Sequence, residues 1–272
     1  MLTKQQKSPR MKSHFSLFLA ALCLLVSCGP DSGSDPLPKE APKVNLEFES
    51  AQVSVDQVVT LKVSTDRPLQ EISRITGNAV ISWLAFDGES LPRSFEVHFR
   101  FPNPGTQTLD LEFRFTDQTK LPKQLQFEVT RGNSVQITGV EVNSFRNINE
   151  SWDPEFGDTD PQRLADVEFV LEKLHLTRWR EKTLTPGRWY KSAIKENQGD
   201  LSWDLSEENL FLDPNGPFFF AMGDNDGNNL GQDLMEALKE VRLRDYMDSR
   251  PESISVVDEA SNLDVTFHLD WP

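Results

Sequence analysis

The 272-residue chain holds 43 Asp and Glu against 28 Lys and Arg, a formal net charge of −15 at pH 7. Such an acidic surface repels nucleic acid and anionic lipid headgroups, so nucleic acid is excluded as a partner. Both cysteines lie within the first 28 residues, and the rest of the chain therefore forms no disulfide and must hold its core by burial alone.

The N-terminus has the pattern of a secretory signal. Basic residues precede a short apolar core, residues 15–27 (FSLFLAALCLLVS). That core is too short to span a bilayer, and polar residues follow it directly, which favours a cleaved signal over a transmembrane helix. Either Met1 or Met11 can serve as the start, because MKSHF is itself a sufficient basic segment.

The end of this signal, Leu25-Val26-Ser27-Cys28, resembles the lipobox of bacterial lipoproteins. The resemblance implies that residues 1–27 are removed and that Cys28 carries lipid on its sulfur and an acylated amine. The protein would then be anchored by acyl chains in the bacterial cell envelope, on the periplasmic or surface side of the outer membrane. The mature chain would keep 24 Lys and Arg against 43 Asp and Glu, a net charge of −19. A soluble secreted protein with an unmodified Cys28 is the alternative.

Residues 28–43 are rich in Pro, Gly, Ser and acids and predict a flexible tether. Residues 44–131 then alternate apolar and polar side chains in one stretch after another, which predicts strands with one buried face. Turn signals separate them, and seven or so short strands in about ninety residues favour an antiparallel β-sandwich. The clearest stretches are VNLEFES (44–50), VVTLKVSTD (58–66), FEVHFRF (95–101), LDLEFRF (109–115) and LQFEV (125–129).

Two segments of this first predicted domain carry a family resemblance. NAVISWLAFDG (78–88) followed by EVHFRFPNPGTQTLDLEFRF (96–115) resembles bacterial Ig-like and polycystic-kidney-disease (PKD) type domains. The pattern suits both families, and each implies a small β-sandwich.

Residues 131–134 (RGNS) predict the joint to a second β-sandwich, residues 135–272. Its first strand, VQITGVEV (135–142), loses its alternation at Gly139, as at a β-bulge. Residues 231–247 (GQDLMEALKEVRLRDYM) fit a helix as well as a strand. The other predicted strands are ADVEFVLEKL (165–174), GRWYKSAIK (187–195), DLSWDL (200–205), GPFFFAM (216–222), SISVV (253–257) and LDVTFHLDW (263–271). The fold class is therefore all-β, with two sandwiches in tandem after a signal and a tether.

Acidic residues follow the most apolar strand, Phe218 to Phe220, which the sequence predicts to be buried on both faces. An EF-hand loop that starts at Asp224 fails, because Asn229 stands at position 6 and Met235 at position 12, where glycine and glutamate are needed.

The stretch FFFAMGDNDGNNLGQ (218–232) resembles the later calcium loop of C2 domains, with Asp224 and Asp226 as its paired aspartates. The resemblance implies Asn228 as a further ligand and an earlier loop that supplies Asp153 and Asp166. Carboxylates gathered at one pole of a sandwich repel one another unless a cation neutralises them, and calcium takes six to eight oxygen ligands. Calcium is thus the predicted cofactor. An ordinary turn suits the same Asp, Asn and Gly residues equally.

No nucleophile-elbow, zincin, Walker or Rossmann motif occurs in the sequence. His98 and His268 are predicted to lie on the polar faces of strands. The residues Trp179, Trp189 and Tyr190 form a basic-aromatic island, either a ligand face or a half-buried strand. The predicted role is not enzymatic: it is binding, adhesion or scaffolding, with a protein or carbohydrate ligand. The alternative is an exported hydrolase of polysaccharide or protein that uses the acidic-loop carboxylates.

Overall fold

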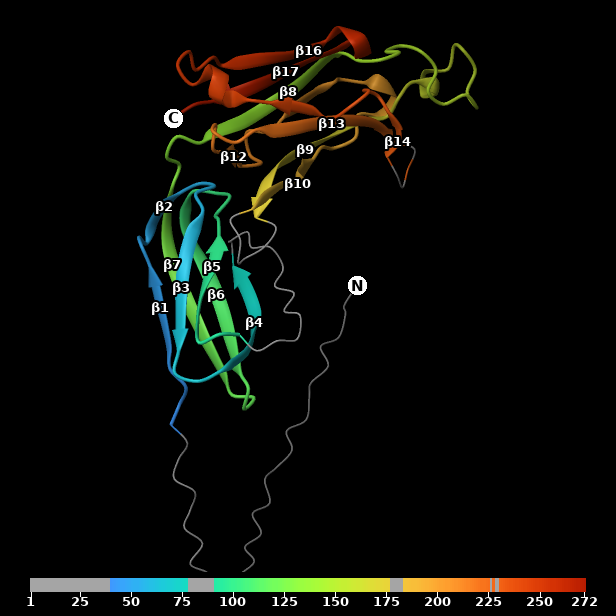
Figure 1. Ribbon diagram of the computed structural model, residues 1–272. Coiled ribbons are helices and arrows are strands. Elements are labelled where there is room, and N and C mark those ends of the chain that lie inside the picture. The colour runs from blue at the N-terminus through green and yellow to red at the C-terminus, as the bar shows by residue number, and fades with distance from the viewer. Residues whose placement is uncertain (1–39, 78–90, 177–182, 226, 228–229) are drawn as a thin grey trace, which may run out of the picture. The chain divides into compact units, whose positions relative to one another are not determined.

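The computed structural model describes residues 40–77, 91–176, 183–225, 227 and 230–272 (Figure 1). The signal, Cys28 and the tether up to residue 39 lie outside the described residues. So do residues 78–88, Trp179, Asp226 and Asn228.

The protein is all-β, as its alternating sequence predicts. Helical structure in the described ranges is confined to short 3-10 turns, and none of these is long and apolar enough to cross a membrane. The turns are η1 (Pro161–Arg163), η2 (Glu196–Gln198), η3 (Leu243–Tyr246) and η4 (Glu259–Ser261).

Residues 44–130 form two sheets that share one apolar core (Figure 1). One sheet has the order β1-β3-β5 and the other β2-β7-β6-β4, and β2 is parallel to β7 while the other pairs are antiparallel. Side chains of both sheets bury together, which makes this half a β-sandwich. The strands are β1 (Val44–Phe48), β2 (Gln52–Ser54), β3 (Val59–Thr65), β4 (Leu69–Gly77), β5 (Ser94–Phe99), β6 (Gly105–Phe115) and β7 (Lys120–Thr130).

Residues 135–270 form a second pair of sheets around a second core. The first sheet has the order β10-β9-β13-β14, with β15 also on β13, and the second the order β11-β8-β17-β16, with β12 also on β8. All these pairs are antiparallel. The strands are β8 (Val135–Ser144), β9 (Val167–Leu176), β10 (Leu184–Lys191), β11 (Ser202–Asp204), β12 (Leu210–Leu212), β13 (Phe218–Asn225), β14 (Leu230–Asp233), β15 (Lys239–Val241), β16 (Ser253–Asp258) and β17 (Leu263–Asp270).

The two sandwiches belong to one compact unit, Ala41–Pro272. Phe211 of β12 packs into the first core, and the guanidinium carbon of Arg131 lies 5.5 Å from the centre of its ring. Arg131 also forms an ion pair of 2.8 Å with Asp270 of β17. The turn of residues 131–134 is thus held to the second sandwich by side chains. Independent folding of residues 44–131 and 135–272 stays a prediction.

The predicted bulge occurs beside Gly139. His268 of β17 pairs with Gly139, whereas the next residue, Leu269, pairs with Ile137, so one residue of β8 is extra. A Cβ at Gly139 would lie only 3.1 Å from the ring of His268 and 3.2 Å from the carbonyl oxygen of Trp203. A larger residue at this position would force these neighbours to move slightly, which is why glycine suits the close approach at the bulge.

Three local predictions are resolved or corrected. His98 was expected on a wet face but is only 3% exposed, and its Nδ1 lies 3.1 Å from the hydroxyl of Thr60. Phe219 is half-buried, so the strand of three phenylalanines is not buried on both faces. The segment that fitted both a helix and a strand forms β15 and η3, with β14 overlapping its start.

Candidate functional site

Two of the five predicted calcium ligands lie side by side. Asp224, at the end of β13, is 0% exposed, and its Oδ1 accepts a hydrogen bond of 2.6 Å from the backbone N–H of Asp166. Asp166 in turn accepts one of 2.8 Å from the backbone N–H of Asn197 through its Oδ1. Each carboxylate therefore fixes the backbone of a segment distant in sequence.

The other predicted ligands are placed less closely or not at all. Asp153 lies in the turns between β8 and β9, where its backbone N–H donates to the carbonyl of Arg163 at 3.2 Å. Asp226 and Asn228 fall outside the described residues. In the part of the chain that the structure describes, no three His, Cys, Asp or Glu side chains are grouped so as to hold a metal. Calcium binding stays a prediction, because its full ligand set includes undescribed residues.

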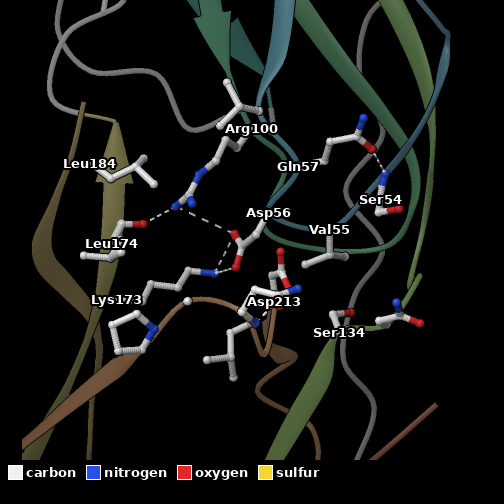
Figure 2. Close-up of a pocket in the computed structure, with 16 residues that line it drawn as sticks. Ser54, Val55, Asp56, Gln57, Arg100, Ser134, Lys173, Leu174, Leu184 and Asp213 are labelled. Carbon is white, nitrogen blue, oxygen red and sulfur yellow. Dashed lines mark hydrogen bonds and ion pairs between the residues drawn. The ribbon is translucent and has the colours of Figure 1, made fainter. Parts of the chain in front are cut away.

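A different feature has the character of a binding site. A cleft of about 580 Å³ is lined by the turn between β2 and β3, by β9 and by the segment after β12 (Figure 2). This volume is within the range of small-molecule sites. The polar residues that line it include Ser54, Asp56, Arg100, Lys173, Asp213 and Asn215.

Asp56 supplies the negative charge at the centre of the cleft wall. It sits in the turn between β2 and β3 with φ of 60°, a left-handed conformation that Asp tolerates better than most residues. Its backbone N–H donates to the carbonyl of Phe101 at 2.9 Å. The turn thus holds the carboxylate in a fixed direction, toward Lys173 and Arg100 (Figure 2).

Lys173 is held by three acceptors. It continues the inward-facing row of β9, after Phe169 and Leu171, and is 3% exposed. Its Nζ donates at 3.0 Å to each carboxylate oxygen of Asp56 and at 3.0 Å to the carbonyl of Phe211. Burial lowers the pKa of Lys173, and the charge and hydrogen bonds of Asp56 oppose that shift. All three N–H groups of the ammonium are therefore in use.

Arg100 uses far fewer of its hydrogen-bond donors than Lys173 does. It follows β5, is 6% exposed, and donates from Nη2 to the carbonyl of Leu174. The same nitrogen lies 3.8 Å from Asp56 Oδ1, an ion pair too long for a hydrogen bond. Its Nε is buried and has no hydrogen-bond partner among the described residues. A guanidinium offers five N–H donors, so most of the capacity of Arg100 is unused.

His175 lies near this cluster. Burial lowers the pKa of its imidazole, the nearby charges of Arg100 and Lys173 lower it further, and the hydrogen bond to Gly187 opposes the shift. Its Nε2 lies 2.9 Å from the carbonyl oxygen of Gly187, which can only accept, so Nε2 carries the proton. A neutral His175 leaves Arg100 and Lys173 as the cations here.

None of the three charged residues was predicted as a site. Lys173 carried a usable signal, because it stands on the apolar row of a predicted strand that also holds Phe169 and Leu171. Arg100 carried none, since it alternates with Phe99 and Phe101 as an exposed residue would.

Comparison with known proteins adds distant likenesses only. No protein-family model matches the chain, and no curated protein matches its sequence. Among solved structures, BcpA, the major pilin subunit of Bacillus cereus, is similar over 74% of this chain with 9% identity and a TM-score of 0.23. A DUF4785 family protein from Legionella pneumophila is similar over 75% with 8% identity and a TM-score of 0.23. Dimeric latent PorU from Porphyromonas gingivalis is similar over 78% with 14% identity and a TM-score of 0.24.

The matched regions span 66%, 56% and 21% of the lengths of those three chains, each less than two thirds. With TM-scores below 0.5, the likenesses establish no shared architecture and no shared role.

Proposed function

We propose that the protein is a lipid-anchored binding protein of the bacterial cell envelope, and that its ligand site is the cleft around Asp56, Arg100 and Lys173. The observation that carries this proposal is the burial of three charged side chains in the wall of one cleft of small-molecule size. Buried charges cost free energy to desolvate, and Arg100 is only partly compensated within the chain. Groups of this kind gather at functional sites more often than elsewhere.

Binding fits the cleft better than catalysis. The amine of Lys173 is the natural candidate for a nucleophile or base, but its three N–H groups are occupied by Asp56 and Phe211. No described contact favours the hydrolase alternative at the acidic loops, where Asp166 and Asp224 each accept a hydrogen bond from a backbone N–H. Adhesion or scaffolding is the setting in which a tethered sandwich with such a cleft would act.

Envelope anchoring through Cys28 is supported by the lipobox resemblance. Calcium binding by Asp153, Asp166, Asp224, Asp226 and Asn228 is a second proposal. The hydrogen bond that joins Asp224 to Asp166 supports it, because it brings the two predicted loops together.

A ligand screen on the purified full chain tests the cleft. Thermal unfolding is measured with monosaccharides, disaccharides, amino acids and dipeptides, each tested singly. Any compound that binds in the cleft stabilises the folded state, by an amount that grows with the logarithm of its concentration divided by its Kd. Asn215→Trp, at an exposed rim position of the cleft, should fill it and remove the stabilisation.

Lys123→Trp is the matched control, because it adds the same bulky side chain at an exposed position of β7 outside the cleft. It should leave the stabilisation intact. If no compound stabilises the chain, or if the two variants respond alike, the cleft is not a binding site.

A further inference from the structure

The unused donors of Arg100 indicate what the cleft recognises. Resting on the proposed binding function, we infer that the cleft takes a small ligand bearing a single carboxylate, and that Arg100 pairs with that group. Arg100 is nine-tenths buried, lines the cleft, and makes one hydrogen bond within the described chain.

The charge balance of the three buried groups favours an anion; Asp213, which also lines the cleft, is only half-buried. Two cations, Arg100 and Lys173, share the one carboxylate of Asp56. Lys173 takes both oxygens of Asp56 at 3.0 Å, and Arg100 is left at 3.8 Å from one of them. The chain as a whole is strongly acidic, so this pair of buried cations is a local exception that an incoming negative charge would compensate.

The two cations differ in what they can still bind. Lys173 has its Nζ between Asp56 and Phe211, and the ring centre of Trp189 lies 4.6 Å away. Lys173 therefore has no N–H donor left for a ligand. Arg100 keeps free N–H donors in a rigid planar fork, the geometry that matches a carboxylate. Arg100 is thus the recognition group and Lys173 a positioning residue that holds Asp56 in place.

A carboxylate suits the cleft better than a phosphate. Asp56 and Asp213 both line the cavity, and two nearby carboxylates repel a doubly charged group more strongly than a singly charged one. Polar side chains on the rim, such as Asn133 and Asn215, can bond to hydroxyl or amide groups in the rest of the ligand. Both a uronic acid and the free carboxylate of an amino acid have this chemistry.

Titration calorimetry with matched probes tests the inference on the full chain. Glucuronate is compared with glucose, and N-acetylalanine with its amide, so that each pair differs at the carboxylate. At least one acid should bind more tightly than its neutral partner by roughly tenfold or more, and the pair concerned identifies the source of the carboxylate. Inorganic phosphate should bind more weakly than that acid.

Arg100→Gln should weaken binding of the acid by at least roughly tenfold, and Arg100→Lys should weaken it in part, because an ammonium keeps the charge but loses the fork. Arg114→Gln is the matched control: Arg114 pairs with Glu71 on the surface at 2.8 Å and should not affect binding. If Arg100→Gln fails to fold, the Nε–H signal of Arg100 in the NMR spectrum of the unmodified chain decides, since it should shift with the acid and not with its neutral partner.

The inference is overturned if neither acid exceeds its neutral partner, if phosphate binds more tightly than both acids, or if Arg100→Gln binds the acid undiminished. If neutral compounds stabilise the unmodified chain but not Asn215→Trp, the cleft remains a binding site and only its preference for a carboxylate is refuted. If Asn215→Trp changes the binding of no compound, the cleft itself is refuted as a site.

Discussion

At the scale of single residues, the pair of Asp56 and Lys173 shows how a buried charge is tolerated. Lys173 is 3% exposed and keeps two partners, the carboxylate of Asp56 and the carbonyl of Phe211. A buried pair of this kind contributes little net stability compared with well-packed apolar residues, but removal of one partner leaves the other charge in a poor environment. Asp56 therefore contributes to stability mainly because its loss would leave the buried ammonium of Lys173 without a counter-charge.

Asp56→Asn should destabilise the protein by about 3–5 kcal/mol, because it leaves Lys173 buried without a counter-charge. Asn tolerates the left-handed backbone at φ of 60° as Asp does, so the change isolates the charge. Urea unfolding followed by tryptophan fluorescence measures it. The double variant Asp56→Asn/Lys173→Met should recover part of the loss, because the ammonium is no longer buried without a counter-charge while Arg100 still lacks the carboxylate of Asp56.

Glu71→Gln is the matched control, because Glu71 pairs with Arg114 on the surface and should contribute only about 0–1 kcal/mol. The effect of pH gives a second check. The pKa of Lys173 in the folded protein is below its ordinary 10.5, so the unfolded state binds more protons and stability should rise as pH increases toward 10.5. The total rise should be larger in Asp56→Asn, because loss of Asp56 lowers the pKa of Lys173 further and the rise begins at a lower pH. If Asp56→Asn has the same free energy of unfolding as Glu71→Gln, the argument that buried Lys173 needs the charge of Asp56 is contradicted.

At the scale of elements, period-two alternation predicts most of the strands. The segments 44–50, 109–115 and 263–271 overlap β1, β6 and β17, and the predicted bulge at Gly139 is present. Alternation works there because one face of each strand packs on a core and the other meets water.

Alternation fails where two elements bury both faces of a strand end. His98 and Arg100 stand on the nominal wet face of their segment, yet both are buried. Arg100 is covered by contacts with Leu174 and Asp56, which lie far from it in sequence. Alternation therefore could not identify Arg100 as a site residue, whereas Asp166 and Asp224 were selected from two acidic loops as calcium ligands, a role that stays a prediction.

The hairpin of β13 and β14 is the element on which calcium binding depends. If calcium binds, thermal unfolding with calcium should occur at a higher temperature than with a chelator, because a ligand of the folded state stabilises it. Asp224→Asn should abolish that difference. It should also destabilise the calcium-free chain by roughly 1–3 kcal/mol, because the hydrogen bond from Asp166 to a carboxylate is weakened.

Asp158→Asn is the control, an exposed acid in the same acidic loop as Asp153, and it should behave like the unmodified chain. Coincident melts with calcium and with chelator would refute the metal proposal. They would leave Asp224 as a buried residue that fixes the backbone of Asp166.

At the scale of the whole molecule, composition and anchoring have to be considered together. Removal of residues 1–27 would leave a net charge of −19, and such a body is repelled by anionic lipid headgroups. Membrane contact by the folded sandwiches is therefore unfavourable. The proposed attachment through acyl chains at Cys28 would avoid this repulsion, because the predicted tether, residues 28–43, would keep the acidic body away from the surface.

Cys28→Ser should release the protein from the membrane. In detergent phase partitioning of bacterial extracts, the unmodified protein should enter the detergent phase and Cys28→Ser the aqueous phase, because the buried acyl chains supply the affinity. Cys23→Ser is the matched control, since Cys23 would leave with the signal and its loss should change nothing. High salt should not release the unmodified protein, because the attachment is hydrophobic and not ionic. Partitioning of the unmodified protein into the aqueous phase would refute lipid anchoring and favour a secreted protein whose cleft meets its ligand in solution.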